Sequence, residues 1–188
     1  KIKICIEKVE YMGSVLNTSL VLSSGDISGQ DYNLIVDWLS KYDIGDISEA
    51  PPIIHNFINL IQNSDLIVAI LDVSQASEYA SPEDALMSQL GKQLPSIAKG
   101  ILYIQYLTRK RLKGIFFVFN KADIHMLRPE DIEPFFRDVF SILLARLRRL
   151  GITWKIYVTS SINWGNKPTQ RLKSWGFDKI LYDMVRLI

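Results

Sequence analysis

Gly114-Ile115-Phe116-Phe117-Val118-Phe119, followed at once by Asn120-Lys121-Ala122-Asp123, is the stretch of sequence that decides the fold. An unbroken apolar run of strand length predicts burial on both faces, which is typical of a parallel sheet covered by helices. Ligands of open parallel sheets bind beyond the carboxyl ends of the strands. The polar turn that starts at Asn120 is therefore the first place to look for function.

Two further runs repeat this pattern along the chain. Asp65–Leu71, apolar after its first residue, and Trp154–Val158, apolar except for Lys155, are both of strand length. We expect parallel strands from both, with Asp65–Leu71 buried on both faces as a central strand. Helices are expected between the strands, because alternation of this kind is typical of a sheet with helices on both faces. They are predicted at 55–61, from Pro82 with a break near Pro95, from about Pro129 to Leu150 with Gly151 as its stop, and from about Thr169.

The first residues predict a different element. Apolar side chains alternate through Ile2, Ile4, Ile6 and Val9, which indicates a strand with one buried face. A turn bracketed by Gly13 and Asn17 and a second strand over 19–22 would complete an antiparallel hairpin. A helical stretch containing Ile35, Val36 and Leu39 follows. The predicted class is therefore α/β, a mostly parallel central sheet with an antiparallel edge hairpin and helices on both faces.

The residues Asn120, Lys121 and Asp123 suit recognition of a purine base. A carboxylate at position 123 can accept two hydrogen bonds from guanine, whose ring N–H lies beside an exocyclic amine. Adenine lacks this pair of donors and would leave the carboxylate unpaired. The Lys121 stem can lie across the base, and Asn120 can tie neighbouring loops together. The alternative is a plain polar turn in which Asp123 caps a helix.

Two other strand ends carry polar residues. Thr159, Ser160 and Ser161 follow the third parallel strand, and small residues there let backbone N–H groups approach a ligand. The loop Asp26-Ile27-Ser28-Gly29-Gln30 follows the hairpin. A carboxylate such as Asp26 can hold Mg²⁺ through its water shell, Gly29 allows close approach to a phosphate, and Gln30 can orient a water. A simple Ser/Thr turn and an ordinary glycine loop are the alternatives.

In order and in strand context, these three segments resemble the Asp-x-x-Gly-Gln, Asn-Lys-x-Asp and Thr-Ser-Ala elements of Ras-like small GTPases. The resemblance implies a single G domain over residues 1–188, with the three-layer fold of P-loop NTPases. It assigns Mg²⁺ to Asp26, sensing of the γ-phosphate to Gly29 and positioning of the attacking water to Gln30. It assigns GTP and GDP binding to Asn120, Lys121, Asp123, Thr159, Ser160 and Ser161, with the Ser161 backbone near the guanine carbonyl.

The chain departs from that family in one respect. No Gly-x-x-x-x-Gly-Lys-Ser/Thr phosphate loop occurs in the 188 residues, since Gly91-Lys92 is the only Gly-Lys pair and Gln93 follows it. In the family this loop precedes the hairpin, so either the loop lies upstream of Lys1 or the domain does not bind nucleotide. The first alternative predicts a GTP/GDP switch with slow Mg²⁺-dependent hydrolysis. The second predicts an inactive G-like domain that binds proteins, and a nucleoside kinase is a third, weaker reading.

Composition limits the classes of partner and the cellular locations that we expect. Net charge is only +2 and gives no indication of nucleic-acid binding. Cys5 is the only cysteine, which excludes an intrachain disulfide and fits a cytoplasmic location. Basic residues cluster at 109–113 and 146–149, where predicted helices end and cations favour the helix dipole; docking of an acidic protein or a membrane surface is the alternative. The expected partners are a guanine nucleotide and regulatory or effector proteins.

Overall fold

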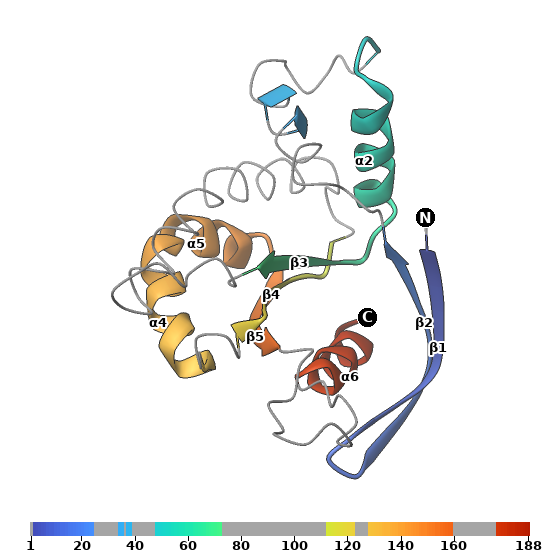
Figure 1. Ribbon diagram of the computed structural model, residues 1–188, viewed down its shortest axis with the longest axis vertical. Helices are drawn as coiled ribbons and strands as arrows, with labels where there is room; N and C mark the ends of the chain where they lie inside the picture. The colour runs from blue at the N-terminus through green and yellow to red at the C-terminus, as the bar shows by residue number, and fades with distance from the viewer. Residues whose placement is uncertain are drawn as a thin grey trace, which may run out of the picture.

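The computed structural model describes residues 2–24, 34–35, 37–38, 48–72, 112–122, 128–159 and 176–188. Within them the elements follow in the order β1 (Ile2–Tyr11), β2 (Ser14–Ser24), α2 (Pro52–Gln62), β3 (Leu66–Asp72), β4 (Gly114–Asn120), α4 (Pro129–Val139), α5 (Ser141–Arg149), β5 (Thr153–Thr159) and α6 (Phe177–Leu187) (Figure 1). This order confirms the predicted α/β class and the predicted hairpin. The predicted helices around Pro82 and Pro95, and the start of the last helix near Thr169, lie outside the described residues.

The three later strands form a parallel sheet in the order β3-β4-β5. Its register is unbroken, from Leu66 opposite Gly114 to Asp72 opposite Asn120, and the last pair of β4 and β5 is Asn120 with Thr159. β4 lies in the middle, and its residues Gly114–Phe119 are all buried. The prediction drawn from this apolar run is therefore confirmed.

β3 differs from its prediction. Within the described part of the chain it is an edge strand rather than a central one, and Ile70 is 67 % exposed although every residue from 66 to 71 is apolar. The physical reason is the missing neighbour: β4 covers one edge of β3, and no described strand pairs with the other. An apolar run records which residues tolerate burial on both faces, but it does not record the order of the strands.

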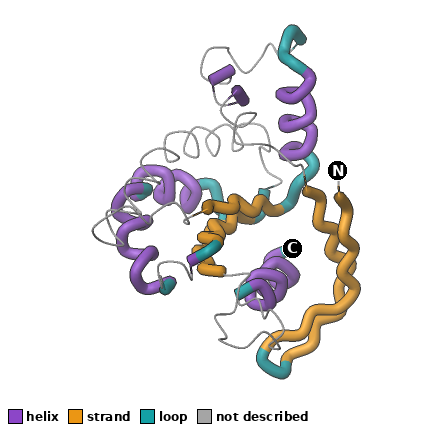
Figure 2. The backbone as a smooth tube through the Cα atoms, in the orientation of Figure 1, coloured by secondary structure: helices purple, strands orange, loops and turns teal. Residues whose placement is uncertain are grey.

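Side chains on the two faces of the sheet belong to two separate cores. Ile115, Phe117 and Phe119 of β4 pack with α2, α4 and α5, whereas Phe116 and Val118 pack with α6 and the hairpin. Figures 1 and 2 show this arrangement, with α4 and α5 on one side of the sheet and α6 between the sheet and the hairpin. The alternation of β4 side chains between the two faces is that of a strand covered on both sides.

The hairpin agrees with its prediction except at the turn. The chain reverses at Met12 and Gly13, both with positive φ, so Asn17 lies inside β2 and the turn predicted to reach it was too long. The pairing shifts register between Ile6, which lies opposite Leu20, and Lys8, which lies opposite Asn17. This irregularity coincides with the step from Ile6 to Val9 in the apolar pattern, where strict alternation fails.

The helix predicted from Pro129 to Leu150 is two helices. α4 ends at Val139 and α5 starts at Ser141, with Phe140 between them at φ −100° and ψ 14°. The buried residues Ile132, Phe136, Leu143, Leu144 and Leu147 keep helical spacing across the break, so periodicity gave no sign of it. Gly151 stops the second helix at φ 72°, as predicted.

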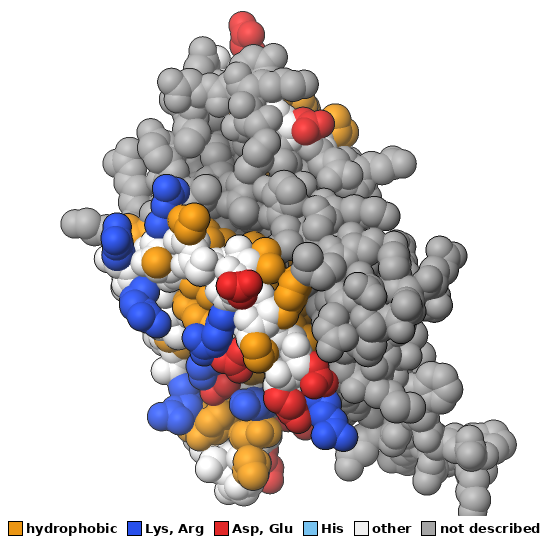
Figure 3. Space-filling view, turned by 90° about the vertical axis from the view of Figure 1, so that its left-hand side faces the viewer, with side chains coloured by type: hydrophobic (Ala, Val, Ile, Leu, Met, Phe, Trp, Pro, Cys, Tyr) orange, Lys and Arg blue, Asp and Glu red, His pale blue; other side chains and the backbone are white. Residues whose placement is uncertain are grey.

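The arginines of the 146–149 cluster lie in the last turn of α5, as predicted for the end of a helix. All three are exposed, and Figure 3 shows basic, acidic and apolar side chains mixed on the face that α4 and α5 present. Arg109, Lys110 and Arg111 lie outside the described residues. No helix of the described part is long and apolar enough to cross a membrane.

Candidate functional site

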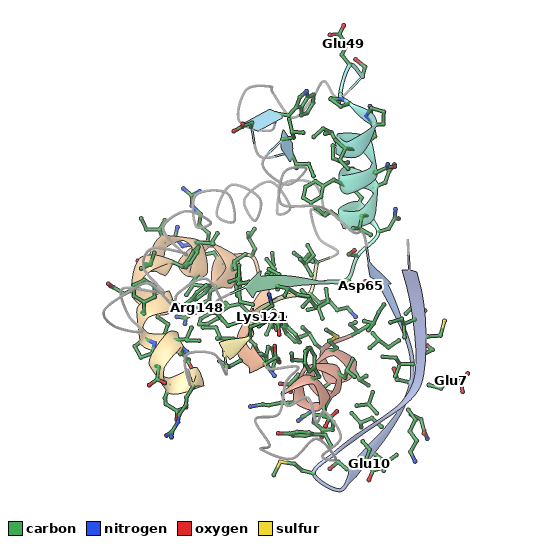
Figure 4. The ribbon with its side chains drawn as sticks, in the orientation of Figure 1. Glu7, Glu10, Glu49, Asp65, Lys121 and Arg148 are labelled. Carbon is green, nitrogen blue, oxygen red and sulfur yellow. The ribbon has the colours of Figure 1, made fainter. Side chains whose placement is uncertain are left out.

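Three polar residues lie side by side at the carboxyl end of the sheet. Asp72 of β3 is the partner of Asn120 in the register, and Asn120 is the partner of Thr159. Each of the three is the last residue of its strand. Asn120 and Thr159, which follow two of the expected strands in the sequence, therefore lie next to each other at one edge of the sheet. In Figure 4, Lys121 marks this carboxyl end and Asp65, just before β3, marks the opposite end.

Asn120 and Thr159 are joined by a side-chain hydrogen bond. The Thr159 hydroxyl donates to Oδ1 of Asn120 over 3.3 Å. Thr159 is fully buried and is the only polar residue in the buried core of the described chain, whereas Asn120 is partly exposed. A buried hydroxyl without a partner is costly, so this bond both satisfies Thr159 and fixes the ends of β4 and β5 to each other.

The chain leaves β4 through an unusual backbone conformation. Lys121 has φ 62°, in the left-handed region, where a residue with a Cβ atom costs about 1–2 kcal/mol. Ala122 follows with its side chain fully buried among the residues that pack against α2, α4 and α5. The left-handed residue thus stands directly before a residue that is buried in the core. Outliers of this type occur disproportionately at ligand sites.

Gly176 brings the start of α6 to the same edge. It precedes Phe177 with φ 87°, and a methyl group in place of its hydrogen would lie 2.5 Å from the carbonyl oxygen of Val158 and 3.1 Å from Cγ2 of Thr159. Only glycine allows this approach. Gly176 was not predicted as a site residue, although a glycine directly before a run of residues with helical apolar spacing was the available signal.

The remaining predicted site residues are not placed. Asp123, Ser160 and Ser161, and likewise Asp26, Gly29 and Gln30, lie outside the described residues. The structure therefore brings together Asn120, Lys121 and Thr159. No group of three or more His, Cys, Asp or Glu residues that could hold a metal ion occurs in the part of the chain that is described.

The comparisons with known proteins give no relative: no family model, no curated protein and no solved structure matches the chain. The chemical character of the edge must therefore be read from its residues. Asn120 has a partly exposed amide and Lys121 carries an ammonium group, whereas the hydroxyl of the fully buried Thr159 is used in its hydrogen bond to Asn120. This set can bind a polar, planar or anionic ligand beyond the strand ends.

Proposed function

We propose that the protein binds guanine nucleotides at the carboxyl edge of the β3-β4-β5 sheet and acts as a GTP/GDP switch. The observation that carries the proposal is the register of Asn120 opposite Thr159, with the hydrogen bond between them. The two motifs proposed to read the base begin at these two residues. A small G domain of the P-loop NTPase fold is part of the proposal, and the α/β architecture supports it.

Covalent geometry brings the other base-recognition residues within reach. Asp123 follows Asn120 by three residues, so its Cα lies within about 11 Å of that of Asn120, and Ser161 lies within about 7 Å of Thr159. Neighbouring strands are about 4.8 Å apart. These limits leave Asp123 and Ser161 up to about 23 Å apart, so the gathering of all six residues around one nucleoside is part of the proposal. In that arrangement, Asp123 would accept the two hydrogen bonds that guanine offers.

The hydrolytic part of the proposal concerns the loop after β2. Gln30 would orient a water whose oxygen attacks the γ-phosphorus, while the bond from that phosphorus to the bridging oxygen of GDP breaks. Asp26 would support Mg²⁺, and Gly29 would sense the γ-phosphate. The 188 residues contain no phosphate loop, so nucleotide binding is the first point that the experiments have to test.

The deciding experiment is a comparison of nucleotide affinities before and after Asp123→Asn. Isothermal titration with GTP, GDP, ATP and XTP in the presence of Mg²⁺ should show binding of GTP and GDP but not of ATP. The substitution replaces a double acceptor by a group with one acceptor and one donor, so the affinity for GTP should fall about 100-fold or more. The affinity for XTP should rise, because xanthine has a carbonyl where guanine has the amine.

Asp138→Asn is the matched control, because Asp138 is an exposed aspartate on α4, away from the strand ends. It should leave all four affinities unchanged. Equal GTP binding by the wild type and by Asp123→Asn would refute the assignment of the base site. If the wild type shows neither heat of binding nor thermal shift with GTP and Mg²⁺, the alternative of a nucleotide-free interaction module is the correct one.

A further inference from the structure

A polar network joins α6 to β5 within an otherwise apolar contact. The Tyr157 hydroxyl donates a hydrogen bond to Oδ2 of Asp183 over 2.7 Å, and Nζ of Lys155 lies 3.0 Å from Oδ1 of the same carboxylate. Lys155 and Tyr157 are two residues apart on β5, so their side chains lie on the same face of the strand. One carboxylate of α6 thus holds two successive side chains of that face.

The three groups carry the protonation states that this network needs. Burial, together with the hydrogen bond to Asp183, raises the pKa of Tyr157, which therefore stays a donor at neutral pH. Burial alone would raise the pKa of Asp183, but the hydrogen bonds from Tyr157 and Lys155 and the charges of Lys155 and Lys179 lower it. The Asp183 side chain is only 13 % exposed. At neutral pH the network consists of a phenol, a carboxylate and an ammonium group.

A second contact between α6 and β5 lies at the strand end. Gly176 touches Val158 and Thr159, as described above. Asp183 follows Gly176 by seven residues, which is about 10 Å along a helix, and the strand residues from Lys155 to Thr159 span about 13 Å. The two contacts therefore fasten α6 along β5 from Lys155 to Thr159, with Asp183 at one end and Gly176 at the other.

Apolar packing alone would leave this alignment loosely defined. α6 already buries Ile180 and Met184 against Phe116 and Val118, and apolar contacts tolerate small shifts of a helix along a strand. Buried ionic groups contribute little net stability in general, but in some proteins they specify one arrangement among several. The contacts of Asp183 with Lys155 and Tyr157 and the contact of Gly176 with Thr159 all depend on the same position of α6 along β5.

We infer that Asp183 is a positioning residue for the guanine-binding edge: it holds α6 on β5 so that Gly176 supports the end of β5 at Thr159. The inference rests on the proposed function for the identity of the ligand, whereas the support of the strand end does not depend on it. Loss of the Asp183 carboxylate should free the start of α6 and the carboxyl end of β5, and should weaken nucleotide binding without removing any group that touches the nucleotide.

Hydrogen–deuterium exchange and GTP titration of the full-length protein test this inference together. In Asp183→Ala, the peptides that span β5 and α6 should exchange about tenfold faster, while those of α2 and β3 keep their protection. The affinity for GTP should fall about tenfold. Asp138→Ala should change neither quantity. Tyr157→Phe keeps the ring and the ion pair, so it should give the same pattern with smaller amplitude, and it replaces Asp183→Ala if that variant does not fold.

The possible outcomes distinguish a failure of the positioning role of Asp183 from a failure of the proposed guanine-nucleotide binding. Uniformly faster exchange in all elements, or no change in β5 and α6, would overturn the positioning role and reduce the network to a general contribution to stability. Local loosening with unchanged GTP affinity would overturn its connection to the site. Local loosening in a protein whose wild type binds no GTP would support the positioning of the strand end while the proposed function fails.

Discussion

Gly151 and Gly176 share a backbone conformation but differ in their surroundings. Their φ angles are 72° and 87°, both in the left-handed region. A methyl group at Gly151 would meet nothing within 4 Å, whereas at Gly176 it would press on the carbonyl of Val158 at 2.5 Å. The two positions therefore separate the cost of backbone strain from the cost of a steric clash.

We expect Gly151→Ala to lower the free energy of unfolding by about 1–2 kcal/mol, the usual cost of a left-handed conformation for a residue with a Cβ atom. Gly176→Ala should cost about 1–3 kcal/mol more, because the backbone of β5 cannot yield as a flexible side chain could. Urea unfolding of both variants measures the difference. Equal losses would mean that α6 moves away from β5 at no cost.

For individual residues, the sequence predicted the polar residues at the ends of strands. It did not predict the residues that hold a strand against its neighbouring helix. Asn120 and Thr159 were identified because polar residues directly follow apolar runs, and the register places them together. Lys155, Tyr157 and Asp183 carried no such signal: a tyrosine and a lysine inside a strand and an aspartate inside a helix are common. Their connection depends on how α6 lies on β5, which no local pattern contains.

The attachment of α6 to β5 through Asp183 predicts that the stability of the protein depends on pH in the acidic range. The pKa of Asp183 is lowered from its ordinary value of 3.8 in the folded protein. A carboxyl group whose pKa is lower in the folded state contributes stability above its unfolded value, and this contribution is lost as the pH falls through the folded value. The network should therefore stabilise the protein at neutral pH and cease to do so in acid below the ordinary value.

Asp183→Asn should be less stable than the wild type by about 1.5–3 kcal/mol at neutral pH, the range for a hydrogen bond to a charged group. This difference should shrink as the pH falls below 3.8. Urea unfolding of both proteins at several pH values measures it. A difference that stays constant down to the lowest pH would show that the charge of Asp183 has no part in holding α6.

Element types were predictable here, but their boundaries and order were less so. Three runs of strand length gave the three parallel strands, and Gly114–Phe119 is the run whose residues are all buried. The break at Phe140 was missed since its buried ring, stacked on Phe136 with 4.3 Å between centroids, continues the apolar stripe. The edge position of β3 was missed because strand order arises from contacts that are distant in sequence.

For the molecule as a whole, β3 is the least protected part of the described sheet. Its apolar residues line an edge without a described partner, and Ile70 is 67 % exposed. Apolar edges of this kind act as templates for pairing with other chains, and charged residues on them prevent it.

We expect Ile70→Lys to change the free energy of unfolding by less than about 0.5 kcal/mol, as for other exposed positions, and to reduce aggregation of the concentrated protein. Chemical denaturation and light scattering measure the two effects. Ile115→Lys, at a fully buried position of β4, is the contrasting control and should abolish folding, because it buries an unpaired charge. A large loss of stability from Ile70→Lys would mean that this edge is covered in the native protein.

The position of α6 between the hairpin and the sheet also constrains how the chain acquires its structure. Tyr11 of β1 meets Tyr182 of α6 with 5.4 Å between ring centroids, so the first and last elements of this sequence become neighbours. The hairpin can form locally soon after its residues leave the ribosome, but its inner face stays uncovered until α6 has been synthesised and packs against it. Contacts so distant in sequence slow folding and prolong the exposure of apolar surface. Nascent chains that stop before Phe177 should therefore depend on chaperones far more than the finished polypeptide does.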